Sequence, residues 1–277
     1  MIQESLTSKM FKWGFNLILL VLALITVIPF IWMLVSSFAP NSEIVKIGGS
    51  FFPKMSTLQN YINVQENFNF MRMFANSLFI AIVVTVIIIY TSAAIGFVFA
   101  KFHFRFKKVI FGIVLSTMML PWCVTIIPKY EMMLQFGWLD SYKSLIIPSM
   151  ISAFGIFLFR QSISQISDEM MEAARIDGAS DFYIFHRIIL PMSRNTIASL
   201  AIFQFLWVWE DFLWPYLMIN DENKQLISVG LRLFNGQYGT DYGGLFAATS
   251  ISIIPVIIIY LIFQKQFVAG IAKGSGK

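Results

Sequence analysis

Long apolar stretches alternate with short polar ones along this chain. A helix needs about 20 residues to cross the ~30 Å hydrocarbon core of a bilayer, and six windows reach that length with few charges. They lie at about residues 13–36, 75–100, 107–128, 142–163, 196–219 and 243–266. The apolar runs are continuous and do not alternate with a period of two, which disfavours a membrane β-barrel. The pattern predicts an all-α, polytopic membrane protein with six transmembrane helices, folded as a single domain over residues 1–277.

The amino-acid composition is typical of a protein that lies mostly within a lipid bilayer. The chain is 57% hydrophobic and 13% charged, and it contains 29 Phe, which is unusual for a soluble domain. One cysteine, Cys123, excludes an intramolecular disulfide and a thiolate metal cluster. His103 and His186 are the only histidines. We therefore expect no metal site and no cofactor bound by this chain.

The positions of Lys and Arg indicate the orientation. An even number of spans puts both termini on one side, and most of the 20 Lys and Arg residues fall on that side. The positive-inside rule then makes the N- and C-termini cytoplasmic. The same excess accounts for the net charge of +5, so no nucleic acid is expected as a partner.

Residues 164–195 form a cytoplasmic segment that is polar yet has helical spacing. Asp168 is a candidate N-cap, with acidic residues in the first turns where the helix dipole favours them. Gly178 permits the left-handed turn that ends a helix, and Ser180 or Asp181 can cap a second one. The sequence therefore predicts a helix, a tight turn and a helix outside the bilayer.

This segment carries a specific motif. Glu172, Ala173 and Ala174 are followed after three residues by Gly178, and the segment closes with Ile188-Ile189-Leu190-Pro191. The chain here resembles the membrane permease subunits of bacterial ATP-binding-cassette importers, and most closely the smaller permease of the maltose type. Further matches are Asn76-Ser77, the Trp209–Pro215 segment and the Phe263–Gly270 segment.

The resemblance implies a function and a set of partners. The helix would be a coupling helix that docks on a cytoplasmic ATPase through Glu172, Ala173, Ala174, Asp177, Gly178 and Ala179. The partners would be a second, larger permease in a heterodimer, two ATPase copies that carry ATP and Mg, and an extracytoplasmic sugar-binding protein. The location would be the bacterial inner membrane. From the residues alone, an amphipathic helix lying on the bilayer surface is the alternative.

The chain departs from this family in two places. Ser167, Asp168 and Asn195 stand where the family often has proline, and the last residues, 272–277, differ from its usual ending. The tail also lacks the hydroxyl and the following helix of a phosphate-binding loop. ATP would therefore be hydrolysed by another chain, and this one is not an enzyme.

The fifth window contains candidates for a substrate pathway. Trp207, Glu210, Asp211 and Trp214 are spaced to share one face of a helix. Carboxylates inside a membrane are costly and are by default functional candidates, and aromatic planes beside carboxylates suit a sugar. The alternatives are structural: Trp214 as an interface-belt residue, and Asp211 as a cap or a partner of Arg232.

An outer loop follows the fifth window. In the resembled family this loop probes the binding protein, and its tip here would be Asn235, Gly236, Gln237, Tyr238 and Gly239. A plain solvent loop is the alternative. For the whole chain the resemblance favours import of a carbohydrate, with an oligosaccharide delivered by the binding protein as the expected substrate. An importer of the same type for a polyamine or phosphate, or a secondary transporter, would be the other functions.

Overall fold

The computed structural model describes residues 6–46, 51–236 and 239–275. Its contacts divide the chain into two compact units, residues 1–70 with 231–252 and residues 71–230 with 253–277. Each unit is described by itself below. The expectation of a single domain stays a prediction.

The first unit is organised around α15. Its elements are α1 (Leu6–Ser36), α2 (Asn41–Ile44), α3 (Gln59–Phe68), the 3-10 turn η4 (Leu231–Phe234), the strand pair β1 (Asn235–Gly236) and β2 (Gly239–Thr240), and α15 (Tyr242–Ser252). α15 packs against α1 and α3. The buried Asn60 amide donates to the backbone oxygens of Ser37 and Ala39, each at 2.8 Å. Gly243 allows this amide to approach, because a Cβ there would lie 2.8 Å from it.

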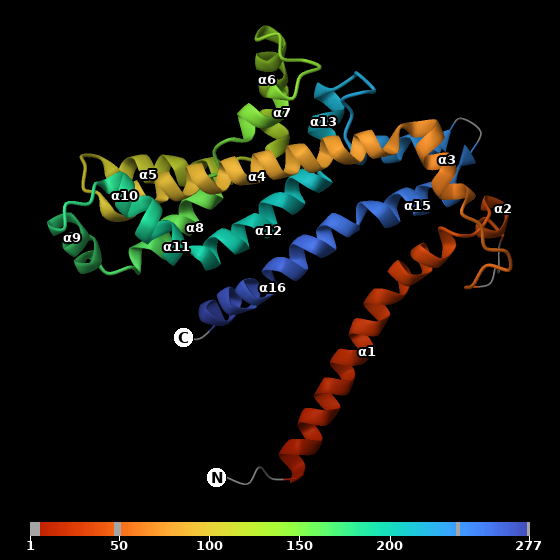
Figure 1. Ribbon diagram of the computed structural model, residues 1–277, viewed down its shortest axis with the longest axis horizontal. Coiled ribbons are helices and arrows are strands. Elements are labelled where there is room, and N and C mark those ends of the chain that lie inside the picture. Colours follow the sequence, from red (N-terminus) through yellow and green to blue (C-terminus); the bar gives the residue numbers. More distant parts are fainter. Residues whose placement is uncertain (1–5, 47–50, 237–238, 276–277) are drawn as a thin grey trace. The chain divides into compact units, whose positions relative to one another are not determined.

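The second unit holds most of the helices. They are α4 (Phe70–Lys101), α5 (Lys107–Ser116), η1 (Thr117–Met119), α6 (Trp122–Gln135), α7 (Lys143–Ile146), η2 (Ile147–Ser149), α8 (Ala153–Ser164), α9 (Asp168–Ile176), α10 (Asp181–Ile184), the π-helical η3 (Phe185–Ile189), α11 (Leu190–Met192), α12 (Arg194–Glu210), α13 (Leu213–Met218), α14 (Ile227–Gly230) and α16 (Ile254–Ser275). α12 lies alongside α16 (Figure 1). Phe159 and Leu200 are fully buried in its core. Gly96 brings α4 close to α8, since a Cβ there would lie 2.6 Å from the Phe159 Cβ.

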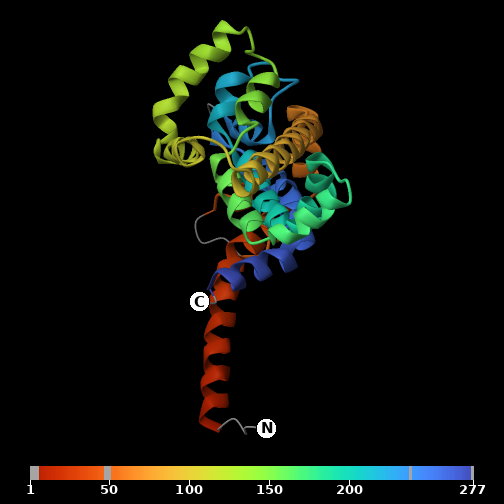
Figure 2. The same cartoon turned by 90° about the vertical axis from the view of Figure 1, so that its left-hand side faces the viewer.

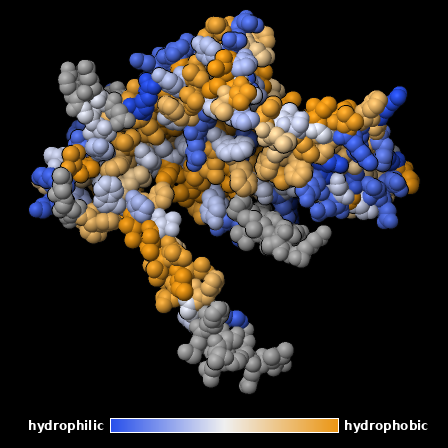
Figure 3. Space-filling view, turned by 180° about the vertical axis from the view of Figure 1, so that it is seen from behind, coloured by the Kyte–Doolittle hydropathy of each residue, from blue (hydrophilic) through white to orange (hydrophobic). Residues whose placement is uncertain are grey.

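Four of the six predicted windows are long and apolar enough to cross a membrane and have no sharp bend. Among the described residues, the helices that are long and apolar enough are Lys12–Ser36, Phe70–Lys101, Lys143–Ser164 and Tyr242–Lys265. Figure 3 shows apolar residues over the described part of α1, and no residue in the most apolar window of this helix is buried within the chain. These helices make the chain an α-helical membrane protein.

The third window, predicted as one span over residues 107–128, is sharply bent and is not a single helix. α5 and α6 meet at an angle of 100° (Figure 2). Pro121 is the cause, because proline disfavours the helical conformation of the residue before it, and Leu120 is extended with ψ 120°. The pair makes a fifth span only if its two halves are counted together.

The fifth window is also broken, and the prediction of a continuous helix over residues 196–219 is wrong. α12 ends at Glu210, Asp211 is extended with ψ 116°, and α13 begins at Leu213. Pro215 has no N–H to donate to the Asp211 carbonyl, as a continuous helix would require. The Ser228 hydroxyl donates to that carbonyl at 2.7 Å instead. The six predicted spans are therefore not all seen as single helices.

Candidate functional site

The polar segment between α8 and α12 begins with a capped helix. α9 starts after Ser167, whose hydroxyl accepts a hydrogen bond from the Glu169 N–H at 3.3 Å. The N-cap is therefore Ser167, and the expectation that Asp168 fills this position is wrong by one residue. Serine fits because its backbone is extended here (φ −61°, ψ 137°) while its oxygen reaches the free N–H groups of the first turn.

The end of α9 is a Schellman motif. The Gly178 N–H donates to the Arg175 oxygen at 3.0 Å, and the Ala179 N–H donates to the Ala174 oxygen at 2.9 Å. Gly178 has φ +83°, as the sequence predicts for the turn residue. Only glycine adopts this conformation without a steric penalty. Ala174 and Ala179 both pack against the core of the second unit, which fixes the turn.

A second helix follows at once and is tied to the first. The Ser180 hydroxyl accepts from the Tyr183 N–H at 3.2 Å, so Ser180 is the cap of α10. The Arg175 guanidinium donates to the Asp181 carboxylate at 3.1 Å from Nε and 2.8 Å from Nη2. Both side chains are half-exposed, so the pair contributes modestly to stability but restricts the angle between the helices.

The outer face of this helix pair combines charge with exposed apolar side chains. Glu172, Ala173 and Asp177 are exposed, whereas Met171 on the opposite face of α9 is buried. Ile176 is 86% exposed and Phe182 is 71% exposed. These two residues escaped the sequence interpretation. Their signal was a large apolar residue on each side of the polar turn at residues 177–181, and exposed apolar side chains beside polar ones are typical of a partner-binding surface.

Asp168 takes part in a different interaction. Its carboxylate accepts a hydrogen bond at 2.7 Å from the Lys101 ammonium at the end of α4. This bond lowers the pKa of the exposed Asp168 carboxyl from its usual value. No local pattern predicts this contact, because the two residues lie 67 positions apart in the chain. In Figure 3, hydrophilic residues gather at the end of the second unit that carries α9.

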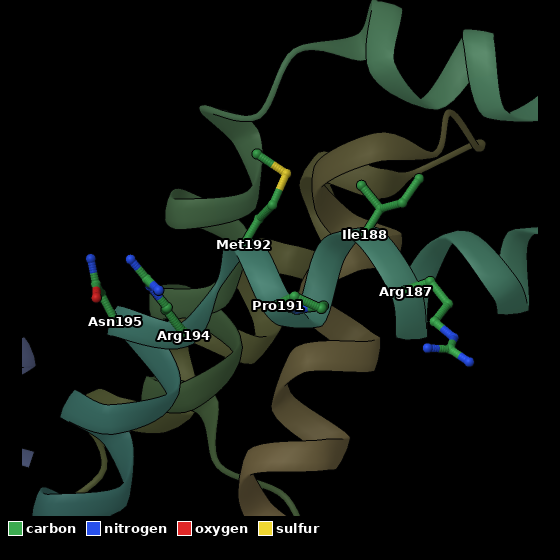
Figure 4. A pocket seen from close by; sticks show the side chains of 6 residues that line it. All are labelled: Arg187, Ile188, Pro191, Met192, Arg194 and Asn195. Carbon is green, nitrogen blue, oxygen red and sulfur yellow. The ribbon is translucent and has the colours of Figure 1, made fainter. Parts of the chain in front are cut away.

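A shallow hollow of about 490 Å³ lies where the polar segment joins α12. It is lined by Arg187, Ile188, Pro191, Met192, Arg194 and Asn195 (Figure 4). Arg187 lies on one side of Pro191 and Arg194 on the other, and the two guanidinium groups point away from each other. One small anion could not bind both. Within the described ranges, no three His, Cys, Asp or Glu side chains are placed to bind a metal ion together.

The predicted pathway residues do not share one face, and this expectation is wrong. Trp207 and Glu210 are exposed on α12, where the helix is still regular. The break after Glu210 then turns the chain. The Asp211 carboxylate accepts from the Trp214 N–H at 3.4 Å, and the buried Trp214 indole donates to the Ser144 oxygen at 3.0 Å. Asp211 and Trp214 therefore stabilise the local fold after the break in the helix.

The loop before α15, predicted to lie on the outer side, contains a short hairpin. Asn235 pairs with Thr240 and Gly236 with Gly239 as antiparallel strands. Gly239 has φ +136°, which glycine alone tolerates well. Gln237 and Tyr238, the middle of the predicted tip, lie outside the described residues.

Comparison with known proteins decides the family. Residues 92–273 match the pattern of the family described as binding-protein-dependent transport system inner membrane component. The chain belongs to this family. Its members are transport components, so this family member is a membrane transport subunit and not an enzyme. The matched residues include the whole capped helix pair.

Named relatives and a solved structure agree with the family. The arabinooligosaccharides transport system permease protein AraQ of Halalkalibacterium halodurans is 31% identical, over 98% of this chain and 98% of that protein. The sn-glycerol-3-phosphate transport system permease protein UgpE of Shigella flexneri is 33% identical, over 82% of this chain and 83% of that protein. A chain of a bacterial ABC transporter involved in the import of the acidic polysaccharide alginate superimposes with a TM-score of 0.82 at 24% identity, over 96% of this family member and 100% of that chain.

Proposed function

We propose that this chain is one permease half of a bacterial ATP-binding-cassette importer for a carbohydrate, with α9 as its coupling helix. It pairs with a second, larger permease, crosses the inner membrane six times with its broken segments included, and keeps both termini in the cytoplasm. The observation that carries the proposal is the rigid pair of α9 and α10. The capped start, the Schellman end and the Arg175–Asp181 ion pair hold an exposed surface in one shape.

The surface suits a cleft on a cytoplasmic ATPase. Glu172 is exposed and free to meet a basic side chain. Ile176 and Phe182 stand out to solvent on either side of the turn, and burying each would contribute about 1.5–3 kcal/mol. Ala173 keeps the face between them thin, so that backbones approach closely. The coupling set of Glu172, Ala173, Ala174, Asp177, Gly178 and Ala179 thus extends to the two apolar residues.

Transport follows from movement of this surface. Two ATPase subunits, which hold ATP and Mg, close on each other and push one coupling helix in each permease. Rigid-body rotation of the membrane helices then switches the central cavity from facing inward to facing outward. A binding protein delivers the solute when the cavity faces out, and the loop proposed to meet it contains the hairpin at Asn235, Gly236 and Gly239.

The substrate pathway is proposed to use one face of α12. Trp207 and Glu210 are three residues apart and both are exposed, so an apolar ring and a hydrogen-bond acceptor lie near each other. This pair suits the C–H face and the hydroxyl groups of a sugar. Asp211 and Trp214 support the turn that ends this face.

Relatives favour two classes of solute. AraQ is named for arabinooligosaccharides, and the structural neighbour for alginate, so an oligosaccharide is the first candidate. UgpE is named for sn-glycerol-3-phosphate, which makes a phosphorylated polyol the second. Proteoliposomes containing the complete importer would decide, with arabinotriose, an alginate trisaccharide and glycerol 3-phosphate as probes. ATP-dependent uptake of either oligosaccharide supports the first candidate, and uptake of glycerol 3-phosphate alone supports the second.

The docking role has its own test. A photo-crosslinking amino acid at Ile176 should attach the ATPase, whereas the same group at Glu222, an exposed position on the outer side of the proposed topology, should not. Equal labelling from both positions, or labelling of lipid alone from Ile176, would contradict the proposal.

A further inference from the structure

The last residue of α4 is a buried cation that reaches the start of α9. The Lys101 side chain is only 4% exposed. Its ammonium donates to the Asp168 carboxylate at 2.7 Å and also to the backbone oxygen of Ile166, which precedes the cap of α9. An ammonium shielded from water interacts more strongly with its acceptors than an exposed one. Lys101 therefore holds the first turn of α9 against the end of α4.

The far side of the helix pair is also attached to α4. The Tyr90 hydroxyl lies 3.3 Å from the His186 Nε2, within hydrogen-bond distance. The Phe97 ring stacks on the Phe185 ring with 5.7 Å between centroids. Since Phe185 and His186 begin η3, directly after α10, both flanks of the docking surface are fixed to the same helix.

The opposite end of α4 is fixed to an outer loop. The Asn76 amide donates to the backbone oxygens of Asn223 at 3.0 Å and Gln225 at 3.1 Å. The buried Ser77 hydroxyl accepts from the Ile227 N–H at 2.7 Å. α4 has 32 residues and no internal proline. At about 1.5 Å per residue, the stretch between these two attachments is a continuous rod roughly 38 Å long.

We propose that Lys101 is a positioning residue that locks the docking surface to α4, so that movement of α9 reaches the outer loop at residues 220–228. This inference rests on the proposed function. A displacement of α9 is transmitted only if the first turn of α9 and the helix α4 move as one rigid body. Lys107 offers a contrast, because its ammonium donates to the Phe102 oxygen at 2.8 Å and does not contact α9. It caps the end of α4 without joining it to the docking surface.

The test places a reporter on the outer loop of the complete importer. A fluorophore is attached to Glu222→Cys, with Cys123→Ser to remove the native thiol, in nanodiscs. ATP with vanadate is added to trap the closed ATPase dimer, and the change in fluorescence is recorded. Lys101→Met should reduce this change about fivefold or more, because it removes the buried ammonium that joins α4 to both Asp168 and the Ile166 oxygen. ATPase binding should persist. Lys107→Met, the matched control, should keep the full change, and Lys101→Arg should restore most of it.

A milder variant, Asp168→Asn, tests the same contact if Lys101→Met assembles poorly. Asp168→Asn removes only the carboxylate charge, and since this side chain is exposed, a reduction of about twofold is expected. Glu169→Gln, in the same first turn, should have no effect. A full fluorescence change in both Lys101→Met and Asp168→Asn would overturn the positioning role. So would loss of the ATPase in Lys101→Met together with a full change in Asp168→Asn. Failure of the unmodified chain to bind any ATPase would instead overturn the proposed function.

Discussion

Replacing Gly178 by alanine should weaken ATPase docking without unfolding the chain. Gly178 has φ +83°, and a Cβ built there meets no atom within 4 Å. The substitution therefore causes no clash, and its whole cost is the left-handed backbone, about 1–2 kcal/mol for an L-residue. This energy corresponds to a factor of about 5–30 in the population of the native turn. The affinity for the ATPase should fall by a similar factor.

The control is another glycine with the same strain. Gly137 has φ +65° and also open space around its Cβ position, but it follows α6, away from the docking surface in sequence. Gly137→Ala should cost about the same backbone energy and leave ATPase affinity unchanged. Gly178→Asn should retain more affinity than Gly178→Ala, since asparagine tolerates this conformation better. ATPase titration into nanodiscs, read by light scattering or interferometry, gives the dissociation constants. Equal constants for the parent chain and Gly178→Ala would refute the reasoning.

Glu172→Ala should lower ATP-driven uptake and Glu172→Lys should lower it more, because a like charge in a partly desolvated interface repels the partner; equal uptake by all three proteins would contradict the pairing. Arg175→Gln should loosen α9 from Asp181 and change ATPase affinity by only about 0.2–1 kcal/mol, because the ion pair is half-exposed, and a loss above tenfold in the same titration would show another role. Asp211→Asn keeps an acceptor for the Trp214 N–H, so complex yield should be nearly unchanged, and uptake should retain its apparent affinity; a shift in affinity would return Asp211 to the solute pathway.

Local chemistry made the helix, tight turn and helix of residues 168–184 predictable from sequence. Gly178 and Ser180 follow rules that act over a few residues, and the structure has a left-handed glycine and a serine cap at these positions. The N-cap of α9 was predicted one residue too late, because Ser167 and Asp168 are both good capping residues and only the backbone angles decide between them. Four apolar windows were recognised because length and hydropathy suffice to predict a span that has no sharp bend.

Long-range contacts and helix breaks were not predictable in this way. The spacing from Trp207 to Trp214 fits a continuous helix. In the structure, the Asp211 carboxylate instead accepts a hydrogen bond from the Trp214 N–H, and the Ser228 hydroxyl donates to the Asp211 backbone oxygen. The contact of Lys101 with Asp168 joins residues 67 positions apart, and no periodicity indicates it. Exposure of Ile176 likewise depends on how α9 packs, which only the structure reveals.

Purification of the intact complex tests whether this chain is a permease subunit that docks on an ATPase. The chain, tagged and expressed with its neighbouring transport genes, would be extracted in mild detergent and weighed by native mass spectrometry. The account predicts one copy of this chain, one copy of a second permease and two copies of an ATPase, with the ATPase lost on Gly178→Ala at low concentration. A chain that purifies without any ATPase, and that still drives solute uptake from an ion gradient in the absence of ATP, would contradict it.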